Sequence, residues 1–83
     1  MEITKYPQLP VTFNFSIEFI LKTDSDVKLT ITDIQGFVIY NTVNSMNLGI
    51  NHYDVDMKNF IPGSYIYRIS AGLSFYSGVF VKM

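Results

Sequence analysis

The stretch VKLTITDIQGFVIY, Val27–Tyr40, carries the clearest fold signal in the chain. Its first six residues alternate between apolar and polar, so their apolar members share one face of an extended strand. In DIQG, Asp33 can open a type I turn, and Gly36 can take the positive φ that closes it. The apolar run FVIYNTV, residues 37–43, follows as a partner strand. The stretch therefore predicts a β-hairpin.

The same period of two continues on both sides of this hairpin. No stretch shows the i, i+3, i+4, i+7 spacing of an amphipathic helix. Short alternating runs, separated by turn residues, predict an all-β fold: an immunoglobulin-like antiparallel β-sandwich of about seven strands. The strands are expected over residues 12–21, 27–32, 37–43, 50–57, 64–70 and 75–83.

The first eleven residues are expected to be a lead-in or linker before a single domain over residues 12–83. Pro7 and Pro10 lack the N–H group that a strand ladder uses, and they favour extended conformations in the residues before them. From Thr12 the alternation begins, and Phe13 is expected on its apolar face.

A second strong signal is NFIPGSYIYRIS, Asn59–Ser70. Pro62 and Gly63 form a turn, and we expect a positive φ at Gly63. Tyr65 and Tyr67 then share one side of the strand that follows.

Composition excludes several classes of function. The chain has 83 residues, of which 48% are hydrophobic and 16% aromatic, so it holds one domain with ample core material. The net charge is −1 and the six basic residues are scattered, which gives no electrostatic footprint for nucleic acid or an anionic membrane. The chain has no cysteine, which excludes disulfides and thiolate metal sites.

Few residues have the chemistry of a catalytic or metal centre. His52 is expected on a solvent-facing strand position, where a surface histidine is favoured over a general base or metal ligand. The pairs Asp24 with Asp26 and Asp54 with Asp56 could offer oxygens to calcium, but neither has the glycine-containing loop of a calcium site. We therefore predict no catalytic residues, no metal and no cofactor.

The aromatic residues near the C-terminus allow two interpretations. They could form an exposed platform for stacking sugars, or alternate ones could lie in the core while the rest pack across strands. Phe37, just after a turn, is expected to be an exposed aromatic residue. The aromatic residues in question are Tyr65, Tyr67, Phe75, Tyr76 and Phe80.

Three segments together, VKLTITDIQGFVIY, GINHYDVDMKNFIPGSYIYRI and SGVFVKM, resemble the type A C-terminal sorting domain of the type IX (Por) secretion system of Bacteroidetes. The similarity covers residues 12–83. The usual Asn-Pro opening is absent, and Ser77 and Gly78 stand where basic residues are common. The matching positions are Val27, Leu29, Ile31, Asp33, Gly36, Gly49, Val55, Asp56, Pro62, Gly63, Tyr65, Tyr67, Arg68, Gly72 and Lys82.

The resemblance implies a non-catalytic signal domain that directs a Sec-exported cargo protein through the type IX system to the cell surface or the medium. Its implied partners are the outer-membrane translocon, a sortase-like protease and the N-terminal cargo domain, and nucleic acid is not among them. A carbohydrate-binding or spacer module of a secreted enzyme is the alternative. The positions implied in recognition are Pro62, Gly63, Tyr65, Tyr67, Arg68, Gly72 and Lys82, and those implied in turns are Asp33, Gly36, Gly49 and Asp56.

The final strand, Phe75–Met83, is expected to be the recognised element. It has little charge, and an edge strand with free N–H and C=O groups is a template for strand addition. We expect the sequence IPGSY to hold this strand in place, with Tyr65 packing beneath it. Weak self-association through edge strands is a further expectation.

Overall fold

The computed structural model describes all 83 residues and is built from strands alone. None of its segments is a helix long and apolar enough to cross a membrane. The prediction of an all-β sandwich of about seven strands is confirmed. The strands are β1 (Glu2–Lys5), β2 (Asn14–Leu21), β3 (Ser25–Asp33), β4 (Val38–Met46), β5 (Gly49–Asp56), β6 (Gly63–Ala71) and β7 (Ser74–Lys82).

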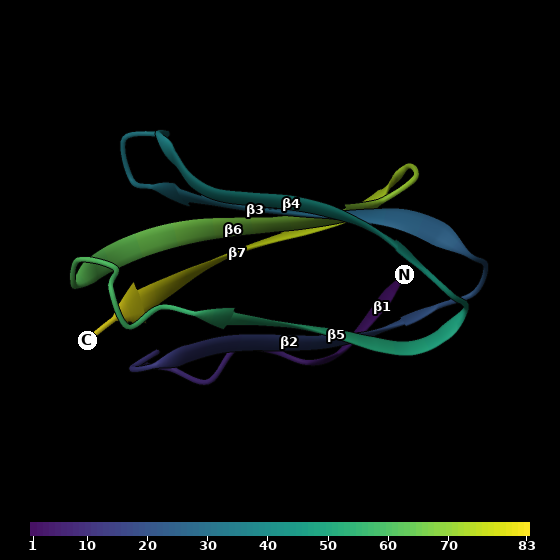
Figure 1. Cartoon of the computed structure of the whole chain (residues 1–83), viewed down its shortest axis with the longest axis horizontal. Helices are drawn as coiled ribbons and strands as arrows, with labels where there is room; N and C mark the ends of the chain where they lie inside the picture. The colour runs from purple at the N-terminus through teal and green to yellow at the C-terminus, as the bar shows by residue number, and fades with distance from the viewer.

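The strands form two layers, which Figure 1 shows facing each other across the core. One sheet has the order β1-β2-β5 and the other has the order β4-β3-β6-β7. All pairs of neighbouring strands are antiparallel. The chain changes sheet between β2 and β3, between β4 and β5, and between β5 and β6, as in immunoglobulin-like sandwiches. The edge strands are therefore β1, β5, β4 and β7.

The core lies between the sheets and follows the expected period of two. Alternate residues of β2, β3 and β6 are buried, so each of these strands turns one face inward. Aromatic rings fill the centre: the ring centroid of Phe15 lies 5.0 Å from those of both Tyr67 and Phe80. The buried apolar residues are Val11, Phe15, Ile17, Phe19, Leu21, Val27, Leu29, Ile31, Tyr53, Val55, Met57, Tyr65, Tyr67, Ile69 and Phe80.

The hairpin between β3 and β4 forms as the sequence predicts. The carboxylate of Asp33 accepts hydrogen bonds from the backbone N–H groups of Gln35 at 2.9 Å and Phe37 at 3.0 Å. Gly36 has a φ of +93°, the left-handed region that glycine enters without steric cost. The side chain of Phe37 is 67% exposed, as expected of a residue at this turn.

The first thirteen residues differ from the expected pattern. Glu2–Lys5 form β1, which pairs with β2 through backbone groups and therefore needs no apolar alternation. Val11 is 2% exposed and belongs to the core. Phe13, expected to face inward, is instead 66% exposed, and β2 begins at Asn14. Val11 lies instead against β7, where it bridges Lys82.

Asp33→Ala should destabilise the domain by about 1 to 3 kcal/mol, because two backbone N–H groups of the turn lose a charged acceptor. Asp33→Asn keeps one acceptor oxygen and should lose less. Urea unfolding of both variants measures the difference. Equal stability of Asp33→Ala and the unchanged chain would show that the carboxylate does not hold the turn.

Candidate functional site

Strand β7 forms one edge of the four-stranded sheet, as the expectation for the terminal strand requires. Its only neighbour within the sheet is β6, with Phe80 opposite Tyr65 and Val79 opposite Ile66. The ladder runs over the full length of β7, from the hairpin at Ala71 and Ser74 to Gly63 and Lys82. One side of β7 is therefore fixed, and the other side is a sheet edge.

Backbone groups on this edge alternate along β7. The carbonyl of Val81 accepts a hydrogen bond from the N–H of Val11, and the N–H of Met83 donates to the carbonyl of Val11, both at 2.8 Å. The backbone groups of these two odd-numbered residues therefore point away from β6. In an antiparallel ladder this direction repeats every second residue, so Phe75, Ser77 and Val79 also present their N–H and C=O groups to the edge. No other strand pairs with them.

Side chains of β7 divide between the two faces of the sheet. Phe80 is 1% exposed, and its ring stacks on that of Tyr65 with centroids 5.5 Å apart. On the opposite face, Phe75 and Val79 are exposed at 58% and 63%. The guanidinium of Arg68 lies 4.2 Å from the centre of the Phe75 ring, a cation–π contact on that outer face. One face thus anchors the strand, and the other is open.

The sequence IPGSY positions β7 through Tyr65. The Tyr65 hydroxyl donates a hydrogen bond to the backbone carbonyl of Ile61, in the loop before β6. This is the tyrosine-corner arrangement of immunoglobulin-like sandwiches, which fixes the corner to the strand that follows. Gly63 has a φ of +155° and pairs with Lys82. The expectation that Tyr65 packs beneath the final strand is confirmed by its stacking on Phe80.

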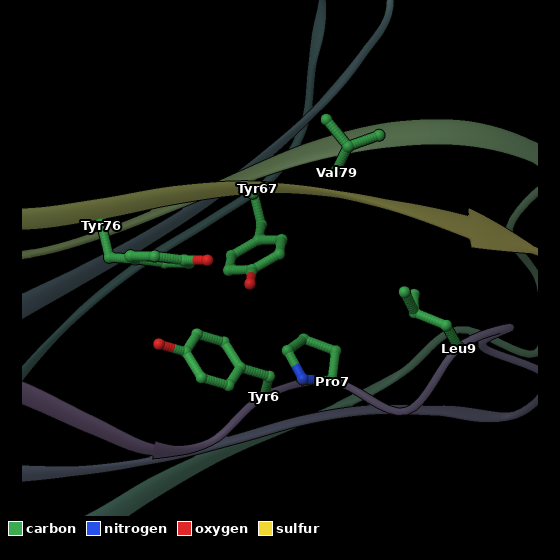
Figure 2. A pocket seen from close by; sticks show the side chains of 7 residues that line it. Tyr6, Pro7, Leu9, Tyr67, Tyr76 and Val79 are labelled. Carbon is green, nitrogen blue, oxygen red and sulfur yellow. The ribbon is translucent and has the colours of Figure 1, made fainter.

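A cavity of about 240 Å³ separates the lead-in from β7. Figure 2 shows Tyr67 and Tyr76 pointing into it from the β6–β7 side, while Tyr6 and Pro7 face them from the lead-in. The ring centroids of Tyr6 and Tyr76 are 5.3 Å apart. Val79 points away from this space in the same view.

Gly78 is needed because the Tyr67 ring lies against its backbone. A Cβ atom at this position would lie 2.6 Å from the Tyr67 hydroxyl oxygen. Sequence reasoning noted Gly78 only as a departure from a family pattern, although a glycine within a strand signals a close approach. Tyr6 and Val11 were also missed, and no alternation pointed to them.

Burial raises the pKa of Tyr67, and the neighbouring Tyr76 adds to the rise. Burial also raises the pKa of Tyr53, with a contribution from Tyr40. The Tyr53 hydroxyl donates a hydrogen bond to the carbonyl of Val27 at 2.8 Å. Both phenols are therefore held in the neutral form, as structural groups of the core.

The residues implied in recognition are divided between the surface and the core. Tyr65 and Tyr67 are 7% and 3% exposed, and Lys82 is 8% exposed. A partner approaching the folded domain meets the exposed group, which consists of Pro62, Gly63, Arg68 and Gly72. The turn group lies at connections or at the strand ends beside them: Asp33 at the end of β3, Gly36 between β3 and β4, Gly49 at the start of β5, and Asp56 at the end of β5.

The other candidate sites have structural roles. Of the five aromatic residues of the suggested sugar platform, Tyr65, Tyr67 and Phe80 are buried, so no continuous exposed platform forms. His52 is exposed and pairs with Asp54 at 3.2 Å. Asp54 also accepts a hydrogen bond from Ser16 at 2.6 Å, so Asp rather than His is central and the trio lacks the order of a catalytic triad.

The acidic pairs hold neighbouring groups of the chain. Asp24 accepts a hydrogen bond from the N–H of Leu48 at 2.8 Å, and Asp26 accepts one from the Ser45 hydroxyl at 2.7 Å. No group of three or more His, Asp or Glu side chains gathers where it could hold a metal ion.

Comparison with known protein families identifies the family of this domain. The model of the family described as the secretion system C-terminal sorting domain matches residues 5–82. The chain belongs to this family. The match extends from the last residue of β1 to the end of β7, so it covers β2 to β7 in full. Comparisons with curated proteins and with solved structures give no match.

The resemblance drawn from the sequence is thereby confirmed: the domain is a type IX secretion C-terminal sorting domain. Interaction with type IX machinery and with a parent cargo protein follows from the family, as does a secreted or cell-surface destination.

The sorting domain should lose stability as the pH rises above about 10, the ordinary pKa of tyrosine. Because the folded state raises the pKa of Tyr67, the unfolded chain releases this proton first, and the stability is complete below that pH. Tyr67→Phe has no proton to release, so its free energy of unfolding should fall less steeply. Urea unfolding between pH 8 and pH 11 measures both slopes. If the unchanged chain and Tyr67→Phe lose stability equally steeply with pH, folding does not raise the pKa of Tyr67.

Gly78→Ala should destabilise the sorting domain by about 1 to 3 kcal/mol, because the new methyl group overlaps the Tyr67 ring. Ser77→Ala, at the adjacent exposed position, is the matched control and should change stability by less than about 0.5 kcal/mol. Denaturant unfolding of the two variants compares them directly. A fully stable Gly78→Ala would show that the ring moves aside without cost.

Proposed function

We propose that this domain is a non-catalytic export signal that the type IX translocon reads through the edge of β7 by strand addition. The observation that carries the proposal is the combination found on β7. Its even-numbered side chains are anchored in the core by Phe80, while Phe75, Ser77 and Val79 offer unpaired backbone groups at the sheet edge. Strand addition uses such groups for affinity and the alternating side chains for register.

The outer face beside this edge supports an apolar, uncharged docking strand. Val79 lies opposite Ile66, Ile66 opposite Thr32, and Thr32 opposite Val38, so one uncharged row crosses all four strands. A strand added beside β7 would extend this row by one position. Arg68, the nearest cation on β6, is already engaged by the Phe75 ring.

The cargo is a protein joined before this domain and exported by the Sec pathway, and it reaches the cell surface or the medium. A sortase-like protease then removes the signal. Pro62 and Gly63 contribute through the corner that positions β6 and β7, and Lys82 contributes at the end of the recognised strand.

Val79→Pro tests the edge directly. Its N–H points away from β6, so proline should leave the ladder to β6 intact and remove one edge donor. Export of a reporter fused before residue 1, in a type IX-competent cell, should fall to background. Val79→Ala keeps the N–H group and should retain export. Circular dichroism and the melting temperature show whether the variants are folded.

Ser77→Pro applies the same reasoning two residues earlier and replaces Val79→Pro if that variant does not fold. Deletion of residues 79–83 should also abolish export. Normal export of a folded proline variant and of the deletion would remove β7 from the mechanism.

A further inference from the structure

The edge of β7 is already occupied at one point by the chain itself. Val11 forms an isolated parallel bridge with Lys82, through its two backbone hydrogen bonds to Val81 and Met83. Its side chain is 2% exposed, so it fills a socket at the margin of the core. The edge of β7 therefore already holds one residue of this chain, Val11, through two backbone hydrogen bonds and one buried apolar side chain.

Besides the packing of the Tyr6 ring against Tyr76, the segment before Val11 is held loosely against β7. Residues 6–10 make no backbone hydrogen bond to this strand, and Pro10 has no N–H to donate. The side chains of Tyr6 and Leu9 are 57% and 64% exposed. Hollows of about 240 Å³ and 300 Å³ remain between this segment and β7. The segment covers the edge without completing a ladder along it.

This cover also hides the last part of the strand. Lys82 lies directly opposite Val11 in the bridge and is 8% exposed. Its stem is packed while its charged end reaches the surface, since no buried nitrogen lacks a partner. A strand that pairs with the whole edge of β7 must take the place of residues 9–11, and in doing so it reaches Lys82.

We propose that residues 9–11 are the resident occupant of a strand-exchange site, and that a partner's extended segment displaces them to dock on β7. The proposal rests on the function proposed above and specifies its partner chemistry. The incoming strand is uncharged, inherits the two hydrogen bonds of Val11, and places a Val-sized side chain in its socket. The partner regains the hydrogen bonds and the buried side chain that Val11 gives up, so these contacts cancel. Only the additional backbone pairing along Phe75–Val79 then needs to favour the bound partner.

A disulfide that locks Val11 to Lys82 tests the exchange. Directly opposed residues of neighbouring strands lie about 5 Å apart, within the range that a disulfide spans. The chain has no cysteine of its own, so Val11→Cys with Lys82→Cys forms a single pair. In the oxidising periplasm, the reporter fused to the locked full chain should be retained, while each single cysteine variant should be exported.

A matched lock elsewhere controls for rigidity and for the disulfide itself. Ser16 and Asp54 are direct partners on the outer face of the other sheet, so Ser16→Cys with Asp54→Cys makes the same kind of cross-strand bridge away from β7. This lock should not affect export. If both locked chains carry verified disulfides and are exported equally well, the exchange proposal is overturned.

Native-state hydrogen exchange of the unaltered chain gives an independent readout that uses no variant. The Met83 amide, bonded to Val11, should exchange through a local opening at much lower free energy than the Phe80 amide in the ladder to β6. Equal opening free energies for the two amides would mean that residues 9–11 leave β7 only on global unfolding, which contradicts the proposed displacement.

The two proposals fail in different ways. If deletion of residues 79–83 leaves export intact, β7 is not the recognised element and the proposed function falls. If the folded Val79→Pro variant loses export while the chain locked at positions 11 and 82 is exported, β7 is read and only the displacement of Val11 is wrong. If the single Lys82→Cys variant loses export, the lysine has a direct role in recognition. The hydrogen-exchange measurement then decides whether Val11 can leave the edge without global unfolding.

Discussion

The burial of Phe80 is the constraint on which the rest of the structure depends. Its ring lies on an edge strand, yet it is 1% exposed and packs 5.0 Å from Phe15 and 5.5 Å from Tyr65. An edge strand pairs on one side only, but here the anchor comes from both sheets and from the tyrosine corner at Ile61. The strand therefore keeps a fixed register while its outer edge stays free of any partner strand. Recognition by strand addition, as proposed above, needs both properties at once.

Much of this arrangement could be predicted because the core obeys a period of two. Wherever one face of a strand is buried, a slip by one residue would expose the whole apolar set, so alternation in the sequence determines the inward face. This is why the hairpin at Asp33, the inward placement of Tyr65 and the edge position of the terminal strand were predicted correctly. The family assignment came from an ordered set of short motifs, since nothing in the periodicity alone distinguishes a sorting domain from any other sandwich.

The parts that escaped prediction rely on backbone pairing or on single contacts. β1 joins its sheet through N–H and C=O groups that every residue carries, and the bridge at Val11 involves one residue, which leaves no periodic trace. Extending the alternation back to Phe13 failed because the chain leaves the edge of β7 after Val11 and joins β2 only at Asn14. Gly78 was visible in the sequence, but its reason, the approach of the Tyr67 ring from β6, depends on which residue lies opposite.

If β7 is recognised through its edge, as we propose, the exposed strand presents a conflict that the lead-in resolves. Free edge groups that attract a receptor also attract other copies of the same chain, and proteins protect such edges with prolines, short pairings or covering loops. Residues 6–11 supply all three: Pro7 and Pro10, a single bridge at Val11, and a segment that stands over the edge. Two neutral hydrogen bonds contribute about 1 to 3 kcal/mol, enough to disfavour casual pairing and little enough for a matched partner to overcome. In the mechanism we propose, protection and recognition are two states of one edge, separated by the displacement of Val11.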